Sequence, residues 1–220
     1  MSNVIVPDGV RLILATHNEG KVNEFRQILT PLIPDFDPSS VVSAKGLGVE
    51  EPVEDGTSFA ANALIKAQAL CKATGLPAIA DDSGLCVDIL GGAPGIFSAR
   101  WCGHHGDDEA NLSLLLNQLA DIVDPHRGAH FMCAAALALP EGEPVVCQAQ
   151  MVGRLVTVPE GDNGFGYDPI FVPASEDAPG GQGRTTAQMS SDEKNAISHR
   201  GQALRMLSEY VAAVFVPQPE

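Results

Sequence analysis

In the first third of the chain, hydrophobic residues occur in two patterns: continuous apolar runs, and apolar positions at helical spacing. Residues 10–16 form an almost continuous apolar run, which predicts a buried strand. Residues 19–29 (EGKVNEFRQIL) instead carry apolar side chains at Val22, Phe25, Ile28 and Leu29, which is helical spacing. The chain is therefore predicted to open as strand, polar turn and helix, and residues 41–49 predict a second short strand.

The remaining segments continue this alternation and then change to consecutive strands. Residues 55–75 predict a helix with Thr57 or Ser58 as its cap and Gly75 at its end. A strand at 77–81 and a helix at 107–122 follow. Two long apolar runs, 129–139 and 144–156, are predicted to pair as a hairpin, and residues 190–215 are predicted to be helical. This order favours a mixed-sheet α/β fold over a purely parallel one.

Glycine and proline gather in two later stretches. Residues 159–169 (PEGDNGFGYDP) predict a glycine-rich loop, and residues 171–186 are predicted to be mobile. Neither stretch resembles a linker between domains, and no internal repeat is present. We therefore expect residues 1–220 to form one domain.

Composition narrows the possible functions. The formal net charge of −15 argues against a nucleic-acid partner, because such binding depends on a surface of Lys and Arg. No run reaches the ~18 apolar residues of a membrane span, and no signal-peptide pattern opens the chain. Five cysteines at irregular spacing favour reduced thiols in the cytoplasm over disulfides or a zinc site.

The hexapeptide THNEGK, residues 16–21, lies where the first strand is predicted to meet the first helix. Backbone N–H groups and the positive end of the helix dipole meet at such a turn, which suits a phosphate group. Lys21 would add a point charge, and Thr16 and Asn18 would add neutral donors. The pattern differs from the P-loop, and an ordinary strand–helix connection remains the alternative.

Acidic residues gather at two places. Asp81 and Asp82 follow an apolar run, and successive side chains on a strand point to opposite faces. Both could face one ligand only if the strand ended between them, which Gly84 would permit. One of these aspartates with a glutamate from elsewhere would suit Mg²⁺, which is often held by one or two carboxylates with waters. Glu54 lies slightly outside the next predicted helix and could face a cleft. The alternatives are a solvated strand end and, for Glu54, an acid before a helix.

Two later motifs could contact a flat ligand. Phe165 and Tyr167 on the glycine-rich loop could stack on it or could fold into the core. On an unbroken helix, at ~100° per residue, Lys194, His199 and Arg200 would point to three different sides. They converge only if the helix breaks near Ser198, which could cap a new helix. Solvated basic residues are the alternative.

Five ordered motifs together resemble the HAM1/inosine triphosphate pyrophosphatase family. They are THNEGK, EDGTSFAANALIKA, AIADDSGLCVDILGGAPGIFSARW, GFGYDPIF and EKNAISHRGQAL, spanning about Leu12 to Leu207. The resemblance implies an elongated mixed α/β fold of two lobes with a central substrate cleft, and a homodimer. It also implies Mg²⁺-dependent hydrolysis of non-standard purine nucleoside triphosphates (ITP, dITP, XTP) to the monophosphate and pyrophosphate.

The resemblance also implies roles for individual residues. Asp82 would accept the proton of the attacking water and, with Glu54, would hold the metal. The substrate-binding set would comprise Thr16, His17, Asn18, Glu19, Gly20, Lys21, Lys66, Ser83, Phe165, Gly166, Tyr167, Asp168, Lys194, His199 and Arg200. Two features depart from the family pattern: His17 replaces a common glycine, and the segment after Val172 is longer and richer in Gly and Pro.

Two other functions compete with this interpretation. One is a metal-dependent nucleotide phosphatase that releases inorganic phosphate, and the other is a nucleotide sensor that does not turn over. The acidic set disfavours the sensor, because binding alone does not require Asp82 as a base.

Overall fold

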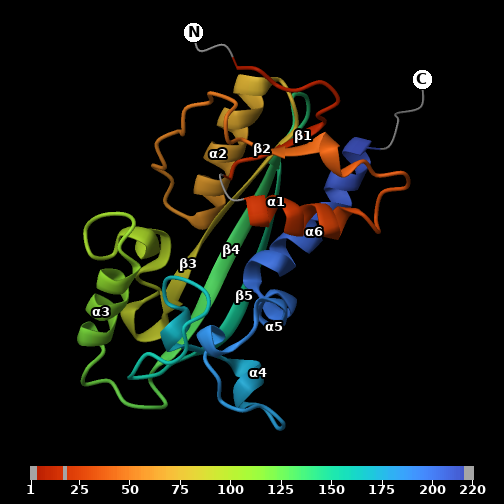
Figure 1. The fold of residues 1–220 in the computed structure, drawn as a ribbon. Helices are drawn as coiled ribbons and strands as arrows, with labels where there is room; N and C mark the ends of the chain where they lie inside the picture. Colours follow the sequence, from red (N-terminus) through yellow and green to blue (C-terminus); the bar gives the residue numbers. More distant parts are fainter. Residues whose placement is uncertain (1–3, 17–18, 216–220) are drawn as a thin grey trace. The chain divides into compact units, whose positions relative to one another are not determined.

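The computed structural model describes residues 4–16 and 19–215, which form two compact units (Figure 1). Unit 1 combines Met1–Asp82, Ala134–Gln148 and Ala203–Glu220, and unit 2 combines Ser83–Cys133 and Ala149–Gln202. Within the described ranges, no helix is long and apolar enough to cross a membrane. The structure describes all five cysteines, and none of them forms a disulfide.

Six strands form one mixed sheet in the order β2-β1-β3-β4-β5-β6. Strand β1 pairs in parallel with β2 and β3, and β5 pairs antiparallel with β6, so the predicted mixed α/β class is confirmed. The strands β4 and β5 are neighbours joined by residues 139–144, in agreement with the predicted hairpin. Their bounds are β1 Leu12–Leu14, β2 Val41–Ser43, β3 Ala78–Val87, β4 Gly128–Ala138, β5 Val145–Leu155 and β6 Phe171–Pro173. The elongated shape and the central cleft stay predictions.

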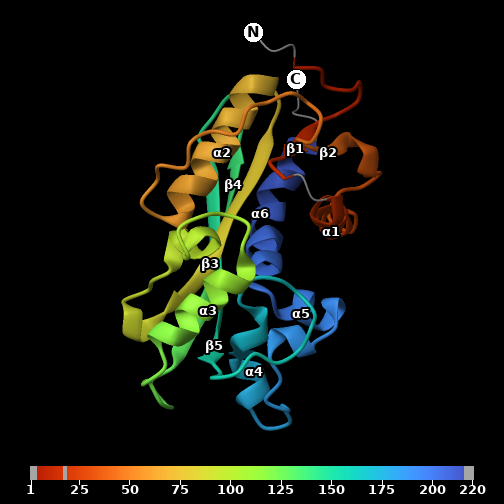
Figure 2. The same ribbon diagram turned by 60° about the vertical axis from the view of Figure 1, so that its left-hand side comes forward.

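Unit 1 contains helices α1 (Glu19–Leu29) and α2 (Phe59–Thr74), both close to their predicted bounds. The Ser58 hydroxyl caps α2 by accepting the Ala61 N–H at 3.2 Å, and Gly75 ends it at φ 70°. Helix α1 lies beside β2 in both views (Figures 1 and 2). The packing largely follows the predicted spacing, since Leu12, Ile13, Val22, Phe25 and Leu29 are fully buried, while Ile28 is half-buried.

Unit 2 contains helices α3 (Asp108–Gln118), α4 (Ala174–Asp177) and α5 (Ser191–Ile197), and α6 (His199–Phe215) begins in it. Asp107 caps α3 through the Ala110 N–H at 2.9 Å. The core of the unit packs α3 against the strands and the glycine-rich loop. Its buried members are Leu85, Val87, Leu112, Leu115, Leu119, Ala129, Met151, Leu155, Tyr167, Ile170 and Phe171.

A buried arginine links the segment that follows helix α3 to the end of strand β5 inside this core. Arg127 is 2% exposed, and its guanidinium donates to the carbonyls of Leu119 and Ile122 after α3 and of Leu155 and Val156 at the end of β5. Burial lowers the pKa of Arg127. The four carbonyls satisfy the buried guanidinium, which would otherwise be costly in a core.

The structure corrects the predicted end of the third strand. The sequence favoured an end near Asp81 with a bend at Gly84, but β3 runs unbroken from Ala78 to Val87. A Cβ at position 84 would lie 2.5 Å from the Gly95 carbonyl oxygen and from the Ser98 hydroxyl oxygen. Gly84 is therefore required for close packing and not for a bend.

The segment 171–186, predicted to be mobile, contains β6 and α4 and is held by charged contacts. The Glu176 carboxylate accepts the N–H groups of Gln182 and Arg184 at 3.1 and 3.2 Å and pairs with the Arg184 guanidinium. Arg184 also binds Glu193 of α5 at 3.0 Å. One arginine thus ties this segment to α5.

Candidate active site

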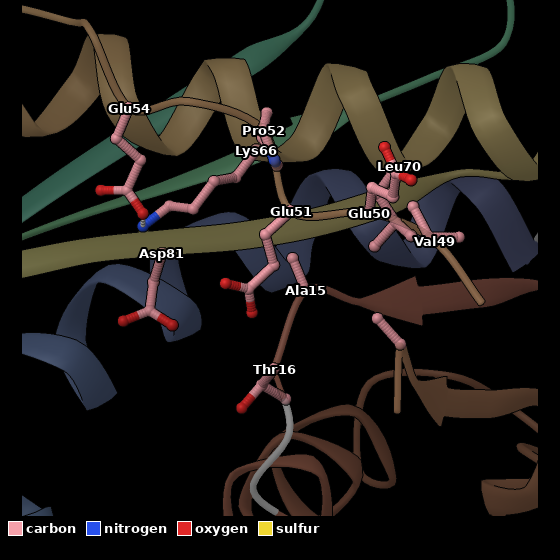
Figure 3. A pocket seen from close by; sticks show the side chains of 11 residues that line it. Ala15, Thr16, Val49, Glu50, Glu51, Pro52, Glu54, Lys66, Leu70 and Asp81 are labelled. Atoms are coloured by element: carbon pink, nitrogen blue, oxygen red, sulfur yellow. Dashed lines mark ion pairs between the residues drawn. The ribbon is translucent and has the colours of Figure 1, made fainter. Parts of the chain in front are cut away.

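Unit 1 contains a pocket of about 300 Å³ with an acidic wall (Figure 3). The close-up shows the carboxylates of Glu51 and Asp81 pointing to the side on which the Thr16 hydroxyl lies. Lys66 reaches in from α2, with its amine next to Glu54. The lining residues are Ala15, Thr16, Ala44, Val49, Glu50, Glu51, Pro52, Glu54, Lys66, Leu70 and Asp81.

Lys66 joins the two residues predicted to hold a metal. Its Nζ lies 3.1 Å from Asp82 Oδ1 and 3.4 Å from Glu54 Oε1. Asn62, one helical turn earlier on α2, donates to Asp82 Oδ2 at 3.3 Å. Both side chains reach the same carboxylate because positions i and i+4 share one face of a helix.

The environment makes Asp82 a stronger base than an ordinary aspartate. Burial raises the pKa of its carboxyl, and the neighbouring Glu54 charge adds to this, while Lys66 and Asn62 act in the opposite direction. The net shift is upward. A carboxylate with a raised pKa accepts a proton from water more readily at neutral pH.

The carboxylate oxygens of Glu54 and Asp82 are suitable ligands for a hard divalent cation. Oxygens of Glu54 and Asp82 both contact one cationic centre, the Lys66 amine, so a single cation can satisfy both. Asn62 is 1% exposed, and its Oδ1 has no hydrogen-bond partner within the described ranges. Those ranges hold no group of three His, Cys, Asp or Glu side chains placed to hold a metal ion.

The predicted phosphate-binding turn is described only in part. Thr16 lines the pocket, while His17 and Asn18 lie outside the described residues. The backbone of Glu19, Gly20 and Lys21 forms the first turn of α1, as expected for a strand–turn–helix connection. The binding role of residues 16–21 stays a prediction.

Unit 2 contains a second pocket, of about 130 Å³, lined by aromatic rings and hydrogen-bond donors. It includes all of the predicted ring-binding residues from 165 to 200, together with Ser83. The lining residues are Ser83, Gly84, Leu85, Ser98, Ala99, Asp108, Phe131, Phe165, Gly166, Tyr167, Asp168, Lys194, His199 and Arg200.

The helix predicted over residues 190–215 is broken at Ser198, which is the condition for its three basic residues to converge. Helix α5 ends at Ile197 and α6 begins at His199. The Ser198 hydroxyl accepts the Gly201 N–H at 3.0 Å, which caps the new helix. This break allows Lys194, His199 and Arg200 to line one pocket, which an unbroken helix would not.

The two residues that open α6 are held by neighbours in the same pocket. The His199 ring stacks on Phe131 with centroids 5.1 Å apart and an interplanar angle of 7°. Arg200 Nη2 donates to Ser83 Oγ at 3.0 Å. The first pair fixes an aromatic wall, and the second links a basic side chain to the strand β3.

The two aromatic residues of the glycine-rich loop have different environments. Tyr167 is 5% exposed, donates its hydroxyl to the Ser98 carbonyl at 2.9 Å and has a pKa raised by burial. Phe165 is 63% exposed, with Lys194 Nζ 4.7 Å from its ring centroid. Tyr167 therefore packs into the core, and Phe165 is the ring that is available for stacking on a ligand.

Several pocket or support residues were missed from the sequence, among them Asn62, Asp108 and Phe131. Asn62 could have been found, because it lies four residues before Lys66 on a predicted helix. Asp108 accepts the Gly166 N–H at 2.9 Å, but in the sequence it looks like an ordinary helix N-terminal acid. Phe131 is one apolar residue in an apolar strand and carries no local signal.

The protein has a mixed α/β fold, with an acidic pocket that contains a lysine in unit 1 and a pocket lined by aromatic and basic side chains in unit 2. The chain belongs to the Ham1 family, whose model matches residues 12–210. A Streptomyces avermitilis protein named dITP/XTP pyrophosphatase is 58% identical over 198 residues, covering 90% of this chain and 94% of that protein.

Two solved structures are similar to this chain. A HAM1 protein from Coxiella burnetii has a TM-score of 0.81 at 38% identity, covering 93% of this chain and 99% of that one. A nucleoside-triphosphatase / dITP/XTP pyrophosphatase from Mycobacterium abscessus has a TM-score of 0.74 at 48% identity, covering 90% and 97%.

Proposed function

We propose that this protein hydrolyses the non-standard purine nucleoside triphosphates ITP, dITP and XTP to the monophosphate and pyrophosphate. Its family and the names of its relatives support this activity. The structural observation that carries the proposal is the Glu54–Lys66–Asp82 group, which combines a half-buried carboxylate of raised pKa with a cation. Removal of such nucleotides would serve nucleotide metabolism in the cytoplasm.

Water would attack the α-phosphorus while Asp82 accepts its proton, and pyrophosphate would leave. A carboxylate general base typically contributes about 10²–10⁴ in rate. Lys66, freed from the carboxylates, and Lys21 would stabilise negative charge on the departing pyrophosphate. Glu54 and Asp82 would hold Mg²⁺, which when bound neutralises charge on phosphate oxygens. Residues 16–21 would bind the triphosphate.

The purine base would bind in the unit 2 pocket. Hypoxanthine and xanthine carry a carbonyl oxygen at C6, whereas adenine carries an amino group there. Lys194, His199 and Arg200 offer N–H donors, which suit the oxygen and leave the amino group facing other donors. Mismatched buried donors cost about 1–3 kcal/mol each, so ATP would be a poor substrate. Ser83 and residues 165–168 would complete this part of the site in each subunit of a homodimer.

A product assay tests the proposal. The protein is incubated with Mg²⁺ and, separately, with ITP, XTP, GTP and ATP, and both products of each reaction are identified. We expect monophosphate and pyrophosphate from ITP and XTP, with ATP far slower. Release of inorganic phosphate from the γ position would instead identify a phosphatase, and tight binding of ITP without turnover would identify a sensor.

A further inference from the structure

One buried carboxylate organises the unit 2 pocket. The Asp168 side chain is 3% exposed, and its Oδ2 accepts the Phe165 N–H at 2.8 Å and the Lys194 ammonium at 2.5 Å. Its Oδ1 accepts the Thr186 hydroxyl at 2.8 Å. A charge so far from water is stable only when such donors satisfy it.

Thr186 supplies the third donor from outside the pocket. It is fully buried, opens the 3-10 helix η5 (Thr186–Gln188) and does not line the pocket. Its hydroxyl also lies 3.1 Å from the Asp168 carbonyl oxygen. Within the part of the chain that the structure describes, the Thr186 hydroxyl is the hydrogen-bond donor to Asp168 Oδ1.

We propose that Thr186 is a positioning residue for recognition of the purine base, acting through Asp168 on Lys194. This inference rests on the proposed function. The hydroxyl fixes one oxygen of the carboxylate, so the other holds the Lys194 amine 4.7 Å from the Phe165 ring centroid. The same oxygen holds the Phe165 backbone, so the amine and the exposed ring share one anchor.

Loss of the hydroxyl would leave Asp168 Oδ1 buried without a donor. The carboxylate would then turn toward other donors, and the Lys194 amine and the Phe165 turn would lose their common anchor. Binding of a base with a C6 carbonyl would weaken, because that oxygen needs the positioned amine. Proton transfer at Asp82 does not involve these contacts, so kcat would change little while KM rises.

The chain offers a matched control in the preceding residue. Thr185 is also fully buried, and its hydroxyl donates to the Glu160 carbonyl at 2.6 Å instead of to Asp168. Thr186→Val and Thr185→Val each remove one buried hydroxyl at nearly constant volume. Thr186→Ser restores the hydroxyl, and Thr186→Ala provides a smaller variant that fits the site if valine impairs folding.

The experiment measures kcat and KM for ITP and ATP by pyrophosphate release, and the affinity for IMP and AMP by calorimetry. For Thr186→Val we expect KM for ITP and Kd for IMP to rise about tenfold, which corresponds to one hydrogen bond. We expect kcat to fall less than threefold and the values for ATP and AMP to change little. Thr186→Ala should behave in the same way, and Thr186→Ser and Thr185→Val should keep the parent values.

Unchanged ITP and IMP constants in both Thr186→Val and Thr186→Ala would overturn the inference, and so would equal losses in Thr185→Val. These results differ from failure of the proposed function, in which the parent protein itself releases no pyrophosphate from ITP.

Discussion

The His199 ring lies parallel to the Phe131 ring at a centroid distance of 5.1 Å, although the two residues belong to different elements, α6 and β4. Phe131 also packs on Phe171 at 4.7 Å. The strand side chain thus supports the imidazole that we propose faces the purine base.

Phe131→Leu should therefore weaken substrate binding. An aromatic pair contributes about 0.5–1.5 kcal/mol beyond its buried area, so we expect KM for ITP to rise roughly 2- to 10-fold with little change in kcat. The matched control is Phe36→Leu, which removes the edge-on pair with Phe215 (5.6 Å, 75°) and lines neither pocket. Equal KM values for both variants and the parent protein would contradict a role for the stack.

Asp82→Asn should abolish most of the turnover while the fold is retained. The amide cannot accept the proton of water, so we expect kcat to fall by at least ~10² at saturating Mg²⁺. Asp81→Asn, on the preceding residue, should reduce kcat less. Circular dichroism checks folding, and pyrophosphate release measures kcat. A near-normal kcat for Asp82→Asn would disprove the base role.

Lys66→Met should raise the affinity of the free protein for a divalent cation. Lys66 now neutralises Glu54 and Asp82, so its removal takes away a competitor for the same oxygens. A partly exposed ion pair contributes up to about 1 kcal/mol, which predicts a roughly 5-fold lower Kd for Mn²⁺ in calorimetry without nucleotide.

The control for this change is Lys72→Met, which removes an exposed positive charge near the end of the same helix. It should leave the Kd for Mn²⁺ unaltered. A weaker Mn²⁺ affinity in Lys66→Met than in Lys72→Met would show that Lys66 supports the metal site and does not compete with it.

Glu193 should make the protein sensitive to acid. Hydrogen bonds from Ser190 and Arg184 lower its pKa from 4.5 to about 2. A folded-state pKa below the unfolded one stabilises the fold above pH 4.5, and this contribution disappears as the pH falls toward 2. Denaturant unfolding at several pH values should show a shallower loss of stability over this interval in Glu193→Gln than in the parent protein.

Glu141→Gln, in the exposed connection between β4 and β5, is the matched change of charge for this test. It should keep the parent slope between pH 4.5 and 2. Identical slopes for all three proteins would exclude a stabilising role for the Glu193 contacts.

Local spacing predicted the helices, and it identified the condition under which three basic residues could converge. Helix α1 is specified within its own segment by apolar periodicity, and α2 by its caps, Ser58 and Gly75. Helical spacing showed that Lys194, His199 and Arg200 could converge only if the helix broke near Ser198, and it left solvated basic residues as the alternative. Each of these inferences depends only on residues close together in the chain.

The features that were missed depend on contacts between distant residues. The length of β3 is set by its sheet partners, so Gly84 looked like a bend although it meets Gly95 and Ser98. The structure of segment 171–186 depends on Arg184 finding Glu176 and Glu193. Thr186 showed no signal, because its relation to Asp168 exists only after the glycine-rich loop has folded.

Arg127 limits how the sequence of unit 2 can change during evolution. Its apolar neighbours can exchange for one another at modest cost, since a core tolerates substitutions that conserve volume. No other side chain can replace Arg127 in this way, because its planar guanidinium donates to four carbonyls, two after α3 and two at the end of β5. Lysine offers three donors from one point and cannot span them. We therefore expect that the apolar residues of this core can change during evolution while the arginine at position 127 is retained.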